Sequence, residues 1–105
     1  MPKPVIVYST CGKLEVAEEI AALLVEDKLA ACVNIVDNVK SVYRWKSEVQ
    51  TDHEVMMMIK TTSNHVQKIQ HLVKKHSGYE LPEVIAVDIT DGSEEYLGWI
   101  AEETD

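Results

Sequence analysis

The chain has 105 residues, of which 46% are hydrophobic, enough for one domain with a single core. Its formal net charge is −8 and Arg44 is its only arginine, which argues against a nucleic-acid partner because phosphate backbones are bound by clustered Lys and Arg. No run approaches the roughly 20 apolar residues that cross a bilayer, and the N-terminus is too short before the first apolar run for a secretory signal. We therefore expect a cytoplasmic protein that binds no membrane.

The first half of the chain predicts two strands around a helix. Residues 4–8 form an apolar, β-branched run that predicts a buried strand, and the turn-forming residues 9–12 follow it. Apolar residues then recur at helical spacing from Leu14, which predicts a helix that ends near Asp27 or Lys28. A second strand is expected over residues 31–46, with a bulge or bend at Asp37 and Asn38.

The third predicted strand, residues 54–60, follows a polar stretch at 47–53 that should contain the turn. Val55, Met57 and Ile59 point to one side of this strand, and Met56 and Met58 point to the other. A two-layer domain covers only one face of its sheet with helices. Because a chain of 105 residues has little left to cover the second face, we expect another copy of the chain to cover it. The methionines then fill the core and an interface rather than bind Cu(I).

The second half predicts a helix, a strand and a final helix. Ser63 or Asn64 can cap the first of these helices, which should end at 76–78 with Gly78 as a left-handed cap. Residues 83–89 predict the fourth strand, and a short helix is expected from 94 to about 102. The order βαββαβ plus a helix predicts one α+β domain over residues 1–105, a ferredoxin-like two-layer sandwich.

Several linked segments of this sequence closely resemble the CutA divalent-cation tolerance family. They are LAACVNI at 29–35, VYRW at 42–45, EVMMMIKT at 54–61, YELPEVI at 79–85 and YLGWI at 96–100. The resemblance covers nearly the whole chain in order. It implies a tight homotrimer whose long hairpins pack across subunits, and a role in tolerance of copper and other divalent metals. It implies no enzymatic activity, because no reaction is securely attached to the family.

The resemblance also suggests where a metal would bind. Copper-binding relatives are proposed to use a cysteine at the end of the first strand and a His-His pair that ends the second helix. Here Ser9 takes the cysteine's position, with Cys11 two residues later, and His76 matches the pair while Ser77 stands second. The candidates for Cu(II) or another divalent cation are therefore His76, Ser9 and Cys11. The alternative for His76 is a half-buried histidine at a helix C-terminus.

Five aromatic or charged residues near the ends of strands and helices suggest a second kind of site. We expect them to line a cleft between subunits that takes a small anion or metabolite, or else to form a polar network that joins the trimer. They are Trp45, Lys60, Tyr79, Glu83 and Tyr96.

Binding of a metal ion or small ligand without catalysis is thus the predicted function. The alternative is a trimeric small-molecule-sensing signal protein like the nitrogen-regulatory transducers, which share this subunit fold and bind nucleotide between subunits. The chain lacks the long basic or glycine-rich loop that phosphates require. An acylphosphatase-like enzyme is disfavoured because no phosphate loop lies between Asn34 and Arg44.

Overall fold

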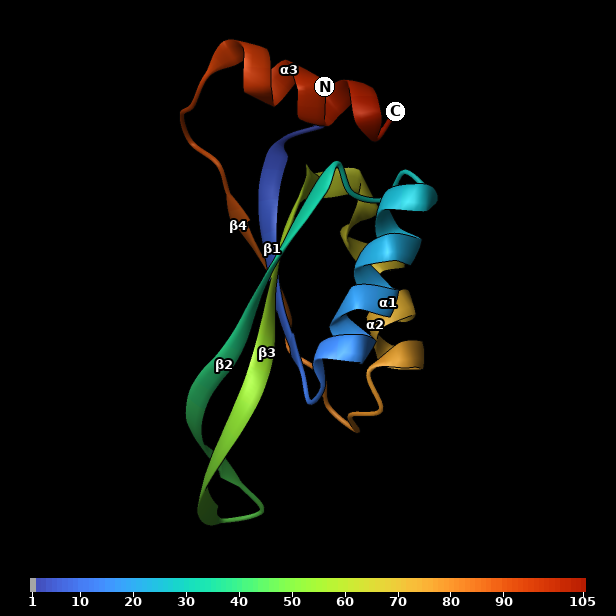
Figure 1. Cartoon of the computed structure of the whole chain (residues 1–105). Coiled ribbons are helices and arrows are strands. Elements are labelled where there is room, and N and C mark those ends of the chain that lie inside the picture. The colour runs from blue at the N-terminus through green and yellow to red at the C-terminus, as the bar shows by residue number, and fades with distance from the viewer. Residues whose placement is uncertain (1) are drawn as a thin grey trace.

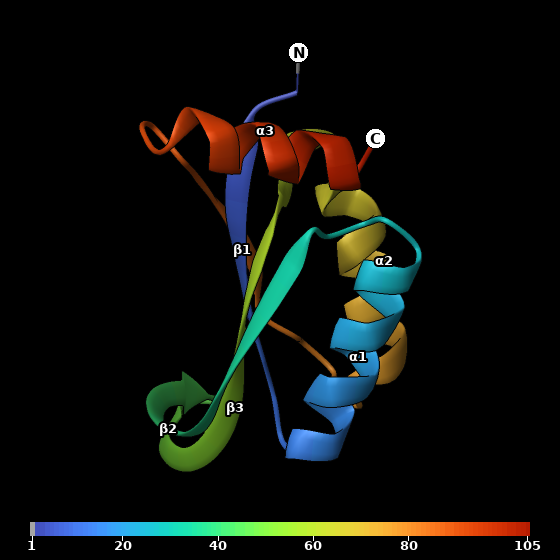
Figure 2. The ribbon, with the colours of Figure 1, turned by 45° about the horizontal axis from the view of Figure 1, so that its top comes forward.

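The computed structural model describes residues 2–105 and has three helices packed with one four-stranded sheet (Figure 1). The strand order is β2-β3-β1-β4, and all neighbouring strands are antiparallel. Helices α1 and α2 lie on one face of the sheet, and α3 crosses its end (Figure 2). This confirms the predicted ferredoxin-like α+β arrangement. The elements are β1 (Pro4–Cys11), α1 (Leu14–Glu26), β2 (Cys32–Trp45), β3 (Glu48–Thr62), the 3-10 turn η1 (Ser63–His65), α2 (Val66–His76), β4 (Val84–Asp88) and α3 (Glu94–Glu103).

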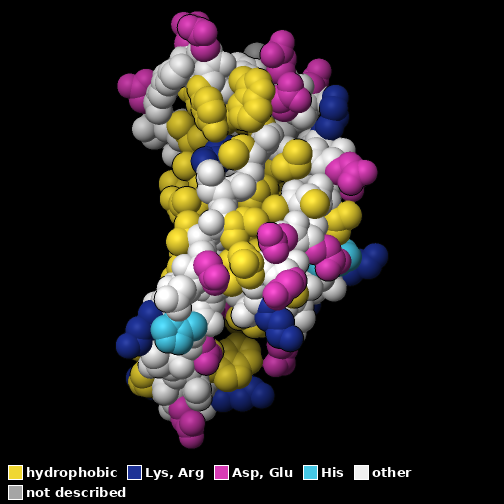
Figure 3. Space-filling model, in the orientation of Figure 1, with side chains coloured by type: hydrophobic (Ala, Val, Ile, Leu, Met, Phe, Trp, Pro, Cys, Tyr) yellow, Lys and Arg dark blue, Asp and Glu magenta, His cyan; other side chains and the backbone are white. Residues whose placement is uncertain are grey.

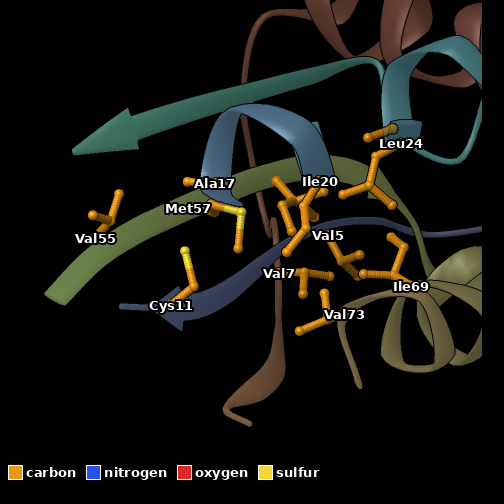
Figure 4. Close-up of a cluster of buried hydrophobic side chains, with 12 residues drawn as sticks. Val5, Val7, Cys11, Ala17, Ile20, Leu24, Val55, Met57, Ile69 and Val73 are labelled. Carbon is orange, nitrogen blue, oxygen red and sulfur yellow. The ribbon is translucent and has the colours of Figure 1, made fainter. Parts of the chain in front are cut away.

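The core lies between the sheet and the pair of helices α1 and α2. Alternate residues of the two central strands point toward the helices, and apolar side chains from one stripe of each helix meet them (Figure 4). Each such side chain contributes roughly 1.5–3 kcal/mol when it is fully buried. Their burial is therefore the main stabilising contribution within one chain. The central members are Val5, Val7, Ile20, Leu24, Met57, Ile59, Ile69 and Val73, none more than 2% exposed.

The second face of the sheet is also apolar, but α1 and α2 lie on the other side of it. We call this surface the open face. Figure 3 shows hydrophobic side chains gathered beside α3 and along the side of the molecule away from α1 and α2. Met56 and Met58 are half-buried there, whereas Val55, Met57 and Ile59 are buried, so the predicted two-sided pattern of this strand is confirmed. The apolar residues of the open face are Ile6, Tyr8, Val36, Met56, Met58, Ile85 and Val87, and the strand register places Asn34 and Lys60 on the same face.

The hairpin of β2 and β3 is longer and tighter than predicted. Its turn consists only of Lys46 and Ser47, because Trp45 already pairs with Glu48, and both turn residues have left-handed φ values of 49° and 69°. Two-residue hairpin turns require such φ values. The turn therefore lies at the start of the region expected at 47–53, and the rest of that region, residues 48–53, is strand rather than loop. The expected bulge is confirmed, because the register shifts between Val36 and Val39.

Two other predicted boundaries also differ from the structure. The strand β1 continues through Ser9 to Cys11, which pairs with Val55, so residues 9–11 form no turn. Neither Ser63 nor Asn64 caps α2, because both belong to η1 and the residue before α2 is His65, whose side chain makes no capping bond. The end of α2 is as predicted, with Gly78 at a φ of 79°.

The outer half of the hairpin projects beyond the helical layer and gives the chain its elongated shape of 44 × 26 × 22 Å (Figure 1). Within residues 2–105, no helix has both the length and the apolar character needed to span a membrane.

Candidate functional site

A cleft of about 710 Å³ opens between the projecting hairpin and the segment that joins α2 to β4. One wall is formed by residues 41–45 of β2, and the other by residues between Gly78 and Glu83. Thr10 at the end of β1 and Glu54 of β3 also line it. We call this space the hairpin cleft. Strands that continue past the helices, together with a linker that turns back beneath them, therefore create the concavity.

The linker wall is fixed by Tyr79. The left-handed φ of Gly78 turns the chain after α2, and the backbone N–H of Tyr79 donates to Ser77 Oγ at 3.2 Å. The Tyr79 hydroxyl donates to Glu54 Oε2 at 2.9 Å and so ties the linker to β3. Burial, and then the contact with Glu54, raises the pKa of the Tyr79 phenol, because both disfavour the phenolate. Tyr79 is therefore a neutral donor at physiological pH.

The hairpin wall carries polar groups that are held across the two strands. The Tyr43 hydroxyl donates to the Asp52 carboxylate, and this hydrogen bond is the main cause that raises the pKa of Tyr43. The ammonium group of Lys46 lies 5.8 Å from the centroid of the Trp45 ring. The wall itself contains the rings of Tyr43 and Trp45 and the guanidinium of Arg44.

The structure brings together three of the five residues predicted for a ligand cleft, namely Trp45, Tyr79 and Glu83. The other two lie elsewhere. Lys60 donates through Nζ to the Asn34 side chain on β2, and Tyr96 on α3 packs against Trp99 with ring centroids 5.4 Å apart.

Sequence reasoning missed Thr10, Arg44 and Glu54 as lining residues. Glu54 carried a usable signal in the sequence, because it is a carboxylate that directly precedes the apolar run at 55–59. Its alternation with Met56 and Met58 places it on the same side of β3 as these methionines.

The three candidate metal ligands lie on the helical side of the molecule. Ser9 and Cys11 are fully buried, and the Cys11 thiol donates to the Lys13 carbonyl at 3.5 Å. Burial raises the pKa of this thiol, which keeps it protonated at neutral pH and weakens it as a metal ligand. His76 Nδ1 lies 3.3 Å from Glu19 Oε1 and links α2 to α1.

No group of three or more His, Cys, Asp or Glu side chains within residues 2–105 is arranged to hold a metal ion. Because the thiol is protonated and Ser9 offers only a hydroxyl, the donors of a single chain do not fit a complete copper site. The metal role of His76, Ser9 and Cys11 stays a prediction.

Comparison with known proteins gives a consistent match along the chain. The family model described as CutA1 divalent ion tolerance protein matches residues 5–103. The divalent-cation tolerance protein CutA of Thermus thermophilus is 44% identical over 99 residues, which cover 94% of this chain and 96% of that protein. The solved structure of the Cut A1 protein from the same organism has a TM-score of 0.94 at 43% identity and covers 97% of this chain and 99% of that one.

Relatives of somewhat lower identity give similar matches. A structure from Archaeoglobus fulgidus, described as a periplasmic divalent cation tolerance protein CutA, has a TM-score of 0.93 at 37% identity and covers 97% of this chain and 99% of that one. The chloroplastic CutA protein of Arabidopsis thaliana is 41% identical over 100 residues, or 95% of this chain and 55% of that protein. The chain thus spans about half the length of this plant relative.

Proposed function

This chain belongs to the CutA1 divalent ion tolerance protein family, and on that premise we propose that it acts as a homotrimeric, non-catalytic binding protein in the response to divalent cations. The open face is the observation that carries this proposal. Val36, Ile85 and Val87 are 41%, 54% and 50% exposed on it, beside the half-buried Met56 and Met58. A contiguous apolar surface of this kind on a soluble chain marks an interaction site.

The occupant of the open face is inferred to be a second copy of the chain. Both sides of β3 are apolar along 55–59, as in a strand buried on both faces, and within residues 2–105 only one side is fully covered. The outer hairpin also exposes apolar side chains, since Val42 and Val49 are each 65% exposed. An assembly in which each hairpin lies along a neighbour would cover both surfaces at once.

The cation response is proposed to depend on the hairpin cleft rather than on a copper ion held by Ser9, Cys11 and His76. The cleft is concave and lies within the roughly 300–1,000 Å³ range of small-ligand sites, whereas the metal candidates do not form a complete ligand set. A cytoplasmic location and the absence of catalysis remain part of the proposal.

Sedimentation velocity at micromolar concentration tests the assembly. We expect the wild-type protein to sediment with about three times the mass of one chain. Ile85→Glu combined with Val87→Glu should release smaller species, because charges on the open face would be buried without partners in an assembly. Val25→Glu is the matched control, since Val25 is 45% exposed but lies on α1.

A folded wild-type monomer at this concentration would overturn the proposal. So would a double variant that keeps the wild-type mass, because the open face could not then be the interface.

A further inference from the structure

We propose that the ammonium group of Lys60 pairs with the carboxylate of Glu48 from a neighbouring copy of the chain, and that this pair fixes how the copies are placed against one another. The inference rests on the proposed function, which puts a second copy on the open face. It adds the polar contact that such a copy has to supply there.

Lys60 is a charged residue within an apolar part of the sheet. The register places Ile6 and Cys32 directly opposite it on the neighbouring strands, and Met58 lies on the same side of β3. Lys60 is already half-buried in the single chain. A molecule that covers Ile6 and Met58 therefore covers the Lys60 ammonium as well.

The chain itself does not neutralise this charge. Lys60 Nζ donates to the Asn34 side chain, whose oxygen is a neutral acceptor, although an ammonium group has three N–H donors. Neither of the two ion pairs found within residues 2–105 includes Lys60. An ammonium group that is buried without a carboxylate is strongly unfavourable. The surface that covers the open face therefore has to carry an acidic group.

The outer hairpin of a neighbouring copy offers one suitable carboxylate. Its acidic residues between the turn and the bulge are Glu48, Asp52 and Glu54. Asp52 accepts a hydrogen bond from Tyr43, and Glu54 accepts one from Tyr79. Glu48 is exposed and has no side-chain partner within residues 2–105. It directly follows the turn, at the end of the hairpin that the proposed assembly lays along a neighbour.

The pair joins two different surfaces of the chain. Lys60 and Glu48 lie toward opposite ends of β3, so one copy gives its Glu48 to one neighbour and its Lys60 to another. Contacts of this kind close into a ring when the rotation between copies allows it. A ring of three copies would contain three such pairs, and exchanging the two charges within the chain would exchange them at every interface.

Sedimentation velocity across a dilution series tests the pairing, in the urea concentration at which the wild-type assembly is half dissociated at micromolar protein. We expect Lys60→Glu and Glu48→Lys each to raise the concentration needed for assembly about tenfold or more, since each places like charges together. The double variant Lys60→Glu with Glu48→Lys should return to within about threefold of the wild type, because the opposite charges meet again. Lys68→Glu on α2 and Glu26→Lys on α1 are exposed matched controls and should assemble as the wild type does.

Lys60→Met distinguishes a lost ion pair from a poorly folded chain, because it keeps a long side chain that suits an apolar surface. It should assemble about threefold more weakly than the wild type, since Glu48 of the neighbour is left without its partner. Far-UV circular dichroism of the same samples verifies that each variant is folded.

Three results would overturn the pairing: a double variant as weak as its single variants, a Lys60→Met protein that assembles more tightly than the wild type, or equal effects of Lys60→Glu and Lys68→Glu. Wild-type sedimentation separates the two proposals. A wild-type assembly of about three chains together with any of these results contradicts only the pairing, whereas a folded wild-type monomer contradicts the proposed function as well.

Discussion

Ser9 and Thr61 lie on the adjacent strands β1 and β3, and only the hydroxyl group of Thr61 has a hydrogen-bond partner within residues 2–105. Both side chains are fully buried. Thr61 Oγ1 donates to the Leu29 carbonyl at 2.7 Å, whereas Ser9 Oγ has no hydrogen-bond partner within residues 2–105. A buried hydroxyl without a partner retains its desolvation cost.

Ser9→Ala should therefore raise the free energy of unfolding by about 1 kcal/mol, and Thr61→Val should lower it by about 1 kcal/mol. Urea denaturation at a fixed protein concentration measures both changes. A loss of stability in Ser9→Ala would contradict this expectation.

Tyr79 should make the protein sensitive to alkaline pH. Its pKa in the folded chain is raised above the ordinary 10.0, first by burial and then by Glu54, so the native state keeps a proton that the unfolded chain loses. The stability contributed by this group is fully present below pH 10 and is lost as the pH rises through the folded pKa. Denaturant midpoints measured from neutral pH to above pH 10 should therefore fall less steeply in Tyr79→Phe than in the wild type.

The wild type and Tyr79→Phe share the buried Cys11 thiol, whose raised pKa acts in the same direction, so their difference isolates Tyr79. Parallel pH profiles for the two proteins would contradict the prediction.

Part of the site could be predicted from single residues, and part could not. Trp45, Tyr79 and Glu83 are aromatic or charged residues at the ends of predicted elements, where clefts form, and the structure brings them together. Lys60 satisfied the same criterion but donates to Asn34 on the neighbouring strand. Sequence spacing gives the side of a strand on which a residue lies, but it does not give the partner that a long flexible side chain reaches.

At the scale of elements, the hairpin turn provides the clearest stability test. Lys46 and Ser47 both have left-handed φ values, which cost a residue with a side chain about 1 kcal/mol or more. Ser47→Gly should therefore raise the thermal midpoint, with a gain of about 1 kcal/mol in the free energy of unfolding.

Glu48→Gly, one residue further on, is the control. Glu48 is already paired in β3, so glycine there should destabilise the protein by roughly 0.5–1 kcal/mol. Equal effects of the two changes would mean that turn strain does not limit the stability of the hairpin.

The ends of β2 and β3 show why the hairpin was predicted only in part. Residues 48–53 read as a polar loop because the outer hairpin lies beyond the helices and has no buried face to impose an apolar alternation. The turn Lys46-Ser47 also lacks the Asn-Gly or Asp-Gly pair that usually marks such hairpins. The inner parts of β1 and β3 were predictable because their periodicity reflects a core.

At the scale of the whole molecule, the two-layer fold followed from the order of periodic segments, and so did the need to cover a second sheet face. The number and arrangement of the proposed partner chains did not follow. Val36, Ile85 and Val87 come from different strands, and only the strand order β2-β3-β1-β4 brings them onto one surface with Met56 and Met58. A single strand shows that its second side is apolar, whereas the outline of the exposed apolar surface is a property of the folded sheet.

The bulge between Val36 and Val39 bends β2 and so helps to set the direction in which the outer hairpin leaves the sheet. The seven residues from Val39 to Trp45 span about 23 Å at the usual rise. A difference of about 10° in the direction of the hairpin at the bulge therefore corresponds to a displacement of roughly 4 Å at its turn. Residues 41–45 of the cleft lining lie on the outer hairpin. Tyr79 is instead hydrogen-bonded to Glu54, which pairs with Val39 beside the bulge. A partner bound at the end of the hairpin would therefore also fix the distance between the two walls of the hairpin cleft. By linkage, a ligand that binds better at one distance between the walls must change the affinity for that partner by the same factor.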